Sequence, residues 1–141
     1  MKRTASAEWN GSLKEGKGAI STASGVLSNT QYSFSTRFED GIGTNPEELL
    51  AASHAGCFSM ALSGQLTTAG LVPESIRTTA AVSLEKTDAG FTVTKSHLTV
   101  TAKVPGATVE AFNTAAANAK AGCPISRVLN AEITMEATLE E

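Results

Sequence analysis

Aromatic and polar residues alternate between Tyr32 and Phe38. A period of two predicts a β-strand with one aromatic face and one polar face, and it places Arg37 on the side opposite the aromatic residues. Before this strand, glycines separate short segments of β-forming residues, such as Ala19-Ile20. The first third of the chain is therefore expected to consist of strands and turns.

The segment Ser75–Val104 shows the same alternation on both sides of a turn signal at residues 88–90. It predicts a β-hairpin, and the inward-facing positions change from odd to even numbers in the second strand. A change of phase indicates one extra residue, so we expect a β-bulge near Lys95 and Ser96. Residues 133–139 alternate again and predict the last strand.

The clearest helix start lies at Asn45, which can cap the helix, and Pro46, which suits its first position. Glu48 completes a capping box, and Glu47 and Glu48 both face the positive end of the helix dipole. Residues 49–66 include no charged residue, and apolar or small residues occur on every face. A helix of this composition is expected to be buried on all sides, in the middle of the assembly.

A second, alanine-rich helix is predicted at residues 108–121, and Gly122 ends it. Pro124 can begin a further short helix over residues 125–129. The elements thus follow the order strands, helix, hairpin, helices, strand, which is typical of an α+β fold and not of repeated βαβ units. The length of 141 residues suits a single domain spanning residues 1–141.

Composition narrows the classes of function. The chain has 11 Lys and Arg against 14 Asp and Glu, for a formal net charge of −3, and it has no basic cluster, so we expect no nucleic-acid partner. Alanine accounts for 22 residues, whereas Leu, Ile, Val and Phe together account for only 29. Alanine buries little apolar area, so a monomer with so few large apolar side chains would be marginally stable. We therefore expect a homodimer whose subunits share core surface.

The cellular compartment of the protein decides how its two cysteines are interpreted. Residues 1–13 include no apolar run, and the uncharged stretch 49–73 is too polar to span a membrane, so we expect a cytoplasmic protein without a membrane partner. The cytoplasm is reducing, which disfavours a permanent disulfide between Cys57 and Cys123. A transient or catalytic thiol pair is the better interpretation.

Cys57 falls in the middle of the uncharged helix, where a buried thiol is ordinarily an inert, small apolar residue. A reactive thiolate there needs a cation, and Arg37 precedes the loop that leads into the helix. At about 100° per residue, Glu47 lies on a face next to Cys57 and Glu48 on the opposite face, so Glu47 is the better candidate to orient the guanidinium. The alternatives are a solvent-facing Arg37 and a Glu47 that only complements the helix dipole.

Cys123 falls between the two later helices, where free backbone N–H groups favour a thiolate, although it could be a plain loop cysteine. Two cysteines that are 66 positions apart suggest one peroxidatic and one resolving thiol, but spacing alone does not show that they meet. His54, three residues before Cys57, would allow a Cys–His pair for acyl transfer. Metal binding by these residues and His97 has little support, because only His54 and Cys57 are closely spaced.

Several segments together resemble the OsmC/Ohr family, and they occur in order over nearly the whole chain. They are Thr36-Arg37-Phe38-Glu39, Gly43-Thr44-Asn45-Pro46-Glu47-Glu48-Leu49-Leu50, Ala55-Gly56-Cys57-Phe58-Ser59-Met60-Ala61 and Ala121-Gly122-Cys123-Pro124-Ile125-Ser126. Two further segments point to the osmotically inducible protein C branch, namely Gly16-Lys17-Gly18 and Ser24-Gly25-Val26-Leu27.

The resemblance implies an intertwined homodimer, with two long central helices wrapped by antiparallel sheets and with active sites at the subunit interface. It implies a peroxidase that reduces organic hydroperoxides, and H2O2 more weakly, in oxidative or osmotic stress defence. By motif, Cys57 would be the peroxidatic cysteine, Cys123 the resolving one, Arg37 the activating cation and Glu47 its orienting partner.

The cycle that the resemblance implies uses no metal, haem or flavin; an external dithiol, of lipoyl type by analogy with the related branch, would reduce a Cys57–Cys123 disulfide. Apolar walls that include Phe38 and Phe58 would favour organic peroxides. The competing hypotheses are a non-catalytic stress-response binding dimer of the same fold and the Cys–His acyl-transfer enzyme.

Overall fold

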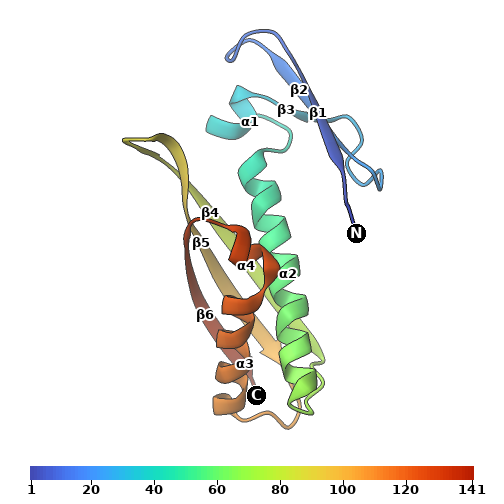
Figure 1. Cartoon of the computed structure of the whole chain (residues 1–141), viewed down its shortest axis with the longest axis vertical. Coiled ribbons are helices and arrows are strands. Elements are labelled where there is room, and N and C mark those ends of the chain that lie inside the picture. Colours follow the sequence, from blue (N-terminus) through green and yellow to red (C-terminus); the bar gives the residue numbers. More distant parts are fainter. The chain divides into compact units, whose positions relative to one another are not determined.

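The computed structural model describes all 141 residues, and the chain divides into two compact units at residues 1–49 and 50–141 (Figure 1). Helix α2, Pro46–Thr68, begins in the first unit and continues through the second. The single domain expected for residues 1–141 therefore stays a prediction. None of the helices is long and apolar enough to cross a membrane.

The first unit contains a three-stranded antiparallel sheet, in the order β1 (Ala5–Asn10), β2 (Lys17–Thr22) and β3 (Thr30–Tyr32). The ring centroids of Trp9 and Tyr32 lie 5.5 Å apart across this sheet. Gly18 lies beneath both rings, and a Cβ atom at this position would overlap them. Glycine is therefore required at position 18 to let the two aromatic side chains pack together.

The strand expected from Tyr32 to Phe38 is wrong beyond Tyr32, because residues Phe34–Phe38 form the short helix α1. Ser33 caps this helix: its Oγ accepts a hydrogen bond from the Thr36 backbone N–H, and the Thr36 hydroxyl accepts one from the Ser33 N–H. Phe34 and Phe38 are four residues apart, a spacing that fits either period over so short a segment. In the helix their ring centroids lie 4.8 Å apart, with the rings tilted by 44°. Arg37 thus lies on a helix and not on a strand.

Helix α2 begins as predicted. The Asn45 side-chain oxygen accepts a 2.8 Å hydrogen bond from the Glu48 backbone N–H. In the single chain one stripe of this helix is exposed, so its burial on all sides within an assembly stays a prediction. That stripe comprises Ala52, Gly56, Met60 and Gly64. Their spacing of four residues places them on one face, which no other element of the second unit covers.

The second unit is built on a sheet in the order β4 (Ser75–Thr87), β5 (Gly90–Lys103) and β6 (Glu132–Glu140). Strands β4 and β5 form the predicted hairpin. The register places Ser83 opposite Lys95 and Leu84 opposite Val93, so the extra residue is Thr94, next to the predicted bulge.

Strand β6 pairs with β5 in the parallel direction, so this sheet is mixed and not purely antiparallel. Helices α3 (Val109–Gly122) and α4 (Pro124–Val128) connect the two strands. A helical crossover of this kind returns the chain to the starting end of β5, which makes parallel pairing possible.

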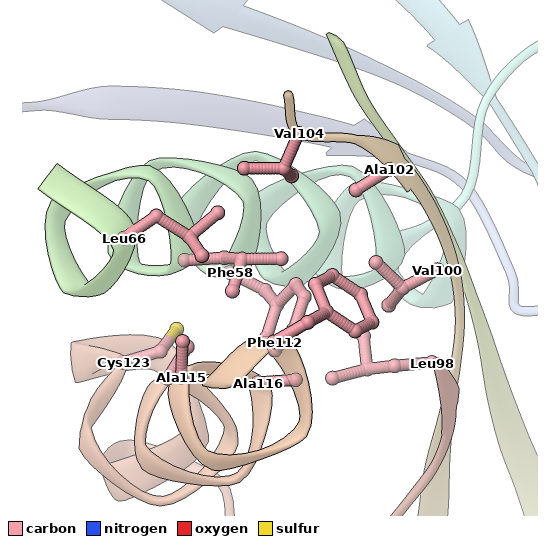
Figure 2. Close-up of a cluster of buried hydrophobic side chains, with 12 residues drawn as sticks. Phe58, Leu66, Leu98, Val100, Ala102, Val104, Phe112, Ala115, Ala116 and Cys123 are labelled. Carbon is pink, nitrogen blue, oxygen red and sulfur yellow. The ribbon is translucent and has the colours of Figure 1, made fainter. Parts of the chain in front are cut away.

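Helices α2 and α3 cover one face of this sheet (Figure 1). Figure 2 shows the core between them, where Phe58 of α2 and Phe112 of α3 meet the inward-facing residues of β5; both phenylalanines are completely buried. Alanines of α3 complete the cluster and keep the helix close to its neighbours. Cys123 is also fully buried and belongs to this cluster, so one of the two thiols is positioned by the core itself.

Candidate active site

The two cysteines, which are 66 residues apart in the sequence, come together in the second unit. The Cys123 thiol donates a hydrogen bond to the sulfur of Cys57, and the two Sγ atoms are 2.7 Å apart. Both are free thiols; Cys57 is partly exposed and Cys123 is buried. The accessible cysteine therefore faces a second thiol at contact distance.

The position of Cys123 follows from the junction between α3 and α4. Its backbone N–H donates to the Ala119 carbonyl and closes α3, and Pro124 then occupies the first position of α4. The Cys123 side chain makes no capping hydrogen bond to α4 and instead points to Cys57. The helix-to-helix junction predicted from the sequence is thus confirmed, and it directs the buried thiol at α2.

The electrostatics within the second unit favour the protonated form of Cys57. Burial raises the pKa of this thiol, and the adjacent Cys123 raises it further, whereas the backbone N–H of Ile125 in α4 opposes the rise. A cation close to Cys57 would oppose this rise in pKa and favour the thiolate.

Arg37 and Glu47 form an ion pair within the first unit. Nη2 of Arg37 lies 2.7 Å from Oε1 of Glu47, and Nε donates to both carboxylate oxygens at 3.0 and 3.3 Å. The Glu47 side chain is 11% exposed, so this pair is shielded on the carboxylate side, and the guanidinium also lies 5.4 Å from the Phe38 ring centroid. The pairing uses Nε and Nη2, and the N–H groups on Nη1 point elsewhere.

Glu48 is used differently from Glu47. Its carboxylate accepts a hydrogen bond from the Thr44 hydroxyl at 2.9 Å, while its backbone N–H serves the cap of α2. Arg37 therefore pairs with Glu47, the acid that the helix phase favoured. The role of this pair in the chemistry stays a prediction.

A hollow of about 260 Å³ borders Arg37 in the first unit. Its walls are mostly aromatic, and they are formed by Trp9, Leu13, Tyr32, Ser33, Phe34, Arg37 and Phe38. Phe38 is among the apolar walls expected from the sequence, but Phe58 is not, because its side chain is completely buried in the core of the second unit. Trp9 and Leu13 lie too far from Arg37 in the sequence for a local pattern to predict that they line the same hollow.

His54 is not paired with Cys57. Its ring nitrogens bond to two serine hydroxyls, Nδ1 to Ser96 at 2.7 Å and Nε2 to Ser126 at 2.8 Å, and the ring is fully buried. Burial lowers the pKa of His54 and keeps it neutral. Because both nitrogens are occupied, His54 is not placed to act as the base of a Cys–His pair.

His97 makes its polar contacts with β6. It bonds to the Thr134 hydroxyl, and its other ring nitrogen is 3.9 Å from Glu136. No group of three or more His, Cys, Asp or Glu side chains is arranged to hold a metal ion. The structure therefore brings the predicted site residues together as two pairs, Cys57 with Cys123 and Arg37 with Glu47, each within its own unit.

Comparison with known proteins identifies relatives over nearly the whole chain. Residues 39–138 match the family described as OsmC-like protein. The chain is 55% identical over 134 residues to Peroxiredoxin OsmC of Escherichia coli (strain K12), a match that covers 95% of this chain and 94% of that protein. Peroxiredoxin OsmC of Shigella flexneri matches with the same identity and coverage.

Solved structures agree with this result. An organic hydroperoxide resistance protein OsmC from Legionella pneumophila superposes with a TM-score of 0.68 at 25% identity, over 98% of this chain and 97% of that one. The organic hydroperoxide resistance protein OhrB of Bacillus subtilis gives a TM-score of 0.70 at 25% identity, over 95% and 97% of the two chains. The predicted OsmC-like α+β fold of the chain is therefore confirmed.

Together the fold, the facing thiols and these matches show that the chain belongs to the OsmC family. It is a cysteine-based, thiol-dependent peroxidase, as its 55% identity to a peroxiredoxin over most of both chains shows. The resemblance drawn from the sequence motifs is thereby confirmed, and the non-catalytic binding dimer is disfavoured.

Proposed function

We propose that this peroxidase reduces organic hydroperoxides through a disulfide between Cys57 and Cys123. The observation that carries the proposal is the 2.7 Å contact between the two sulfur atoms. At this separation the two sulfur atoms need to approach by less than about 1 Å to reach the length of an S–S bond. Cys57 is the exposed member of the pair and hence the one that peroxide can reach.

In the first step the Cys57 thiolate attacks the distal oxygen of the hydroperoxide and breaks the O–O bond. The alkoxide takes up a proton and leaves as alcohol, and Cys57 becomes a sulfenic acid. In the second step the Cys123 sulfur attacks the Cys57 sulfur, and hydroxide takes up the Cys123 proton and leaves as water. An external dithiol then reduces the disulfide by exchange, returns both thiols and leaves as its own disulfide.

We propose Arg37 as the cation that stabilises the Cys57 thiolate, in the same subunit or in the partner. Support comes from two facts: burial raises the pKa of Cys57, and the guanidinium of Arg37 is held by Glu47 through two of its nitrogens. A fixed guanidinium also stabilises charge that develops on the leaving oxygen. Glu47 then acts as the orienting partner, because a carboxylate that accepts two N–H groups restricts the plane of the guanidinium.

The proposed substrates are hydroperoxides with an apolar organic group. Support comes from the aromatic hollow beside Arg37, whose volume of about 260 Å³ suits an alkyl or aryl group and not only a peroxide. Two of the solved relatives are described as organic hydroperoxide resistance proteins. H2O2 has no group to fill this hollow and is expected to react more slowly.

We further propose that the active form is an intertwined homodimer of one-domain subunits, acting in the cytoplasm in defence against oxidative or osmotic stress. The exposed stripe Ala52–Gly64 on α2 is uncharged, and its small residues would let a second α2 approach closely. A second subunit would bury the methionine in that stripe, Met60, which is 78% exposed in one chain. The reducing cytoplasm suits two cysteines that must return to thiols, with a dithiol of lipoyl type as reductant.

The proposal is tested by intact-mass spectrometry after one equivalent of cumene hydroperoxide. The unaltered protein is expected to lose about 2 mass units as the disulfide forms. Cys57→Ser is expected to abolish peroxide consumption in the presence of a dithiol, whereas Cys123→Ser should still consume one equivalent and then accumulate oxygen on Cys57. Full peroxidase activity in Cys57→Ser would overturn the assignment.

A further inference from the structure

The resolving thiol depends on a very short element. Helix α4 has only five residues, and the residue that precedes it, Cys123, provides no side-chain cap. A helix of this length has little stability of its own, because nucleation costs more than so few hydrogen bonds return. Yet α4 must hold two groups against the Cys57 sulfur, namely the Cys123 thiol and the Ile125 backbone N–H.

One buried side chain links α4 to the two elements beneath it. His54 of α2 bonds through Nε2 to the Ser126 hydroxyl of α4 and through Nδ1 to the Ser96 hydroxyl of β5. His54 and Ser96 are both completely buried. A neutral imidazole has one donor and one acceptor nitrogen, and each hydroxyl can serve either, so both bonds form without a charge.

This link lies next to the thiol pair along the same two elements. His54 is three residues before Cys57 on α2, and Ser126 is three residues after Cys123 in α4. Helices α2 and α4 are therefore joined by two contacts about one turn apart. The thiol contact changes at every step of the catalytic cycle, whereas the contact between His54 and Ser126 involves no reacting atom.

We propose that His54 is a positioning residue for the resolving step of the function proposed above, on which this inference rests. Its bond to Ser126 keeps the first turn of α4 in place while the Cys57 sulfenic acid waits for attack. The Cys123 sulfur then forms the S–S bond, and the sulfenic oxygen leaves as water. A second hydroperoxide competes with this step and converts the sulfenic acid to sulfinic acid with release of a second alcohol. His54 thus raises the peroxide concentration at which Cys57 is over-oxidised.

The competition between resolution and over-oxidation of Cys57 allows the rate of resolution to be measured. Resolution is intramolecular and over-oxidation is bimolecular, so the hydroperoxide concentration at which half of Cys57 becomes sulfinic per turnover is proportional to the rate constant of resolution. Ser126→Ala removes the link to α4, and Ser96→Ala is the matched control, because it orphans one imidazole nitrogen in the same way and leaves α4 attached. Intact-mass spectrometry of the full-length protein, with a dithiol and increasing cumene hydroperoxide, gives this concentration for each variant.

We expect Ser126→Ala to lower the half-oxidation concentration on the order of fivefold, the equivalent of one net hydrogen bond. Ser126→Thr, which keeps the hydroxyl, should restore it, and Ser96→Ala should shift it less than about twofold. His54→Leu breaks the same link from the other side and should match Ser126→Ala, which provides a second variant should Ser126→Ala fold poorly.

Equal shifts in Ser126→Ala and Ser96→Ala would overturn the inference, because the effect would then come from the disturbed imidazole and not from its bond to α4. No shift in either variant would also overturn it, because the bond to Ser126 would then not affect resolution. Cys123→Ser provides the reference for an enzyme without resolution. If the unaltered protein already over-oxidises as readily as Cys123→Ser, the proposed disulfide itself fails, and this outcome is distinct from a failure of the His54 link.

Discussion

The Glu47 carboxylate holds the Arg37 guanidinium through Nε and Nη2, with a closest approach of 2.7 Å. The side chain of Glu47 is shielded and that of Arg37 is 39% exposed, so the guanidinium is held along its Nε–Nη2 edge and is partly open to solvent. This arrangement restricts the orientation of the cation and leaves part of its surface accessible.

The carboxylate of Glu47 should therefore matter for the rate of Cys57 oxidation. Glu47→Gln keeps the shape of the side chain but weakens charge-assisted hydrogen bonds, and we expect the second-order rate constant for an organic hydroperoxide to fall roughly tenfold or more. Stopped-flow kinetics measures this rate constant. Glu48→Gln is the matched control, because its carboxylate contacts Thr44, and an equal fall in both variants would contradict the role of Glu47.

Leu13 tests whether the hollow in the first unit receives the organic part of the substrate. Its side chain lines the hollow yet is 68% exposed, so Leu13→Gln should leave the fold intact. We expect KM for cumene hydroperoxide to rise about threefold to tenfold, because part of the apolar contact is lost, with little change for H2O2. Ile42→Gln alters a similarly exposed apolar residue of the same unit outside the hollow, and it should change neither value.

The sequence predicted most elements of the fold because their signals are local. Asn45 and Pro46 mark the start of α2, and the change of phase before Ser96 marks the bulge at Thr94. The same kind of signal failed at α1, where the capping hydrogen bonds of Ser33 outweighed an alternation only a few residues long.

The cysteine pair could be suggested but not placed by sequence, because a contact over 66 residues depends on tertiary packing. Ser96 and Ser126 were not recognised as partners of His54 for the same reason: a serine carries no signal of its partner until the fold brings His54 between them. The parallel pairing of β6 likewise follows from the path of α3 and α4 and not from any pattern within the strand.

The neutral, buried His54 should make stability depend on pH in the mildly acidic range. Burial lowers the pKa of His54 in the folded state below the ordinary 6.5, so the unfolded chain binds the proton more readily. The free energy of unfolding should therefore be unaffected by this group above pH 6.5 and should fall as the pH drops below 6.5 toward the folded-state pKa. Urea denaturation between pH 7 and about pH 5 measures this fall.

Replacement of His54 by leucine should flatten this part of the profile, because no titrating group is left at the buried site. His97→Gln is the control, because it removes the other histidine and leaves the buried imidazole of His54 in place, so this variant should keep the fall seen in the unaltered protein. If the fall disappears in His97→Gln and persists in His54→Leu, the pH dependence does not come from His54.

Met60 provides the test of the proposed dimer. Its side chain is 78% exposed in the single chain and lies between Gly56 and Gly64 on the uncharged face of α2, so a charge there would be tolerated by one subunit but not at an interface between two. We expect the unaltered protein to sediment at twice its chain mass and Met60→Arg to shift toward the monomer by at least about tenfold in dissociation constant. Val72→Arg places the same charge at an equally exposed site after α2 and should leave the dimer unchanged. Identical sedimentation of Met60→Arg and the unaltered protein would show that this face of α2 is not the interface.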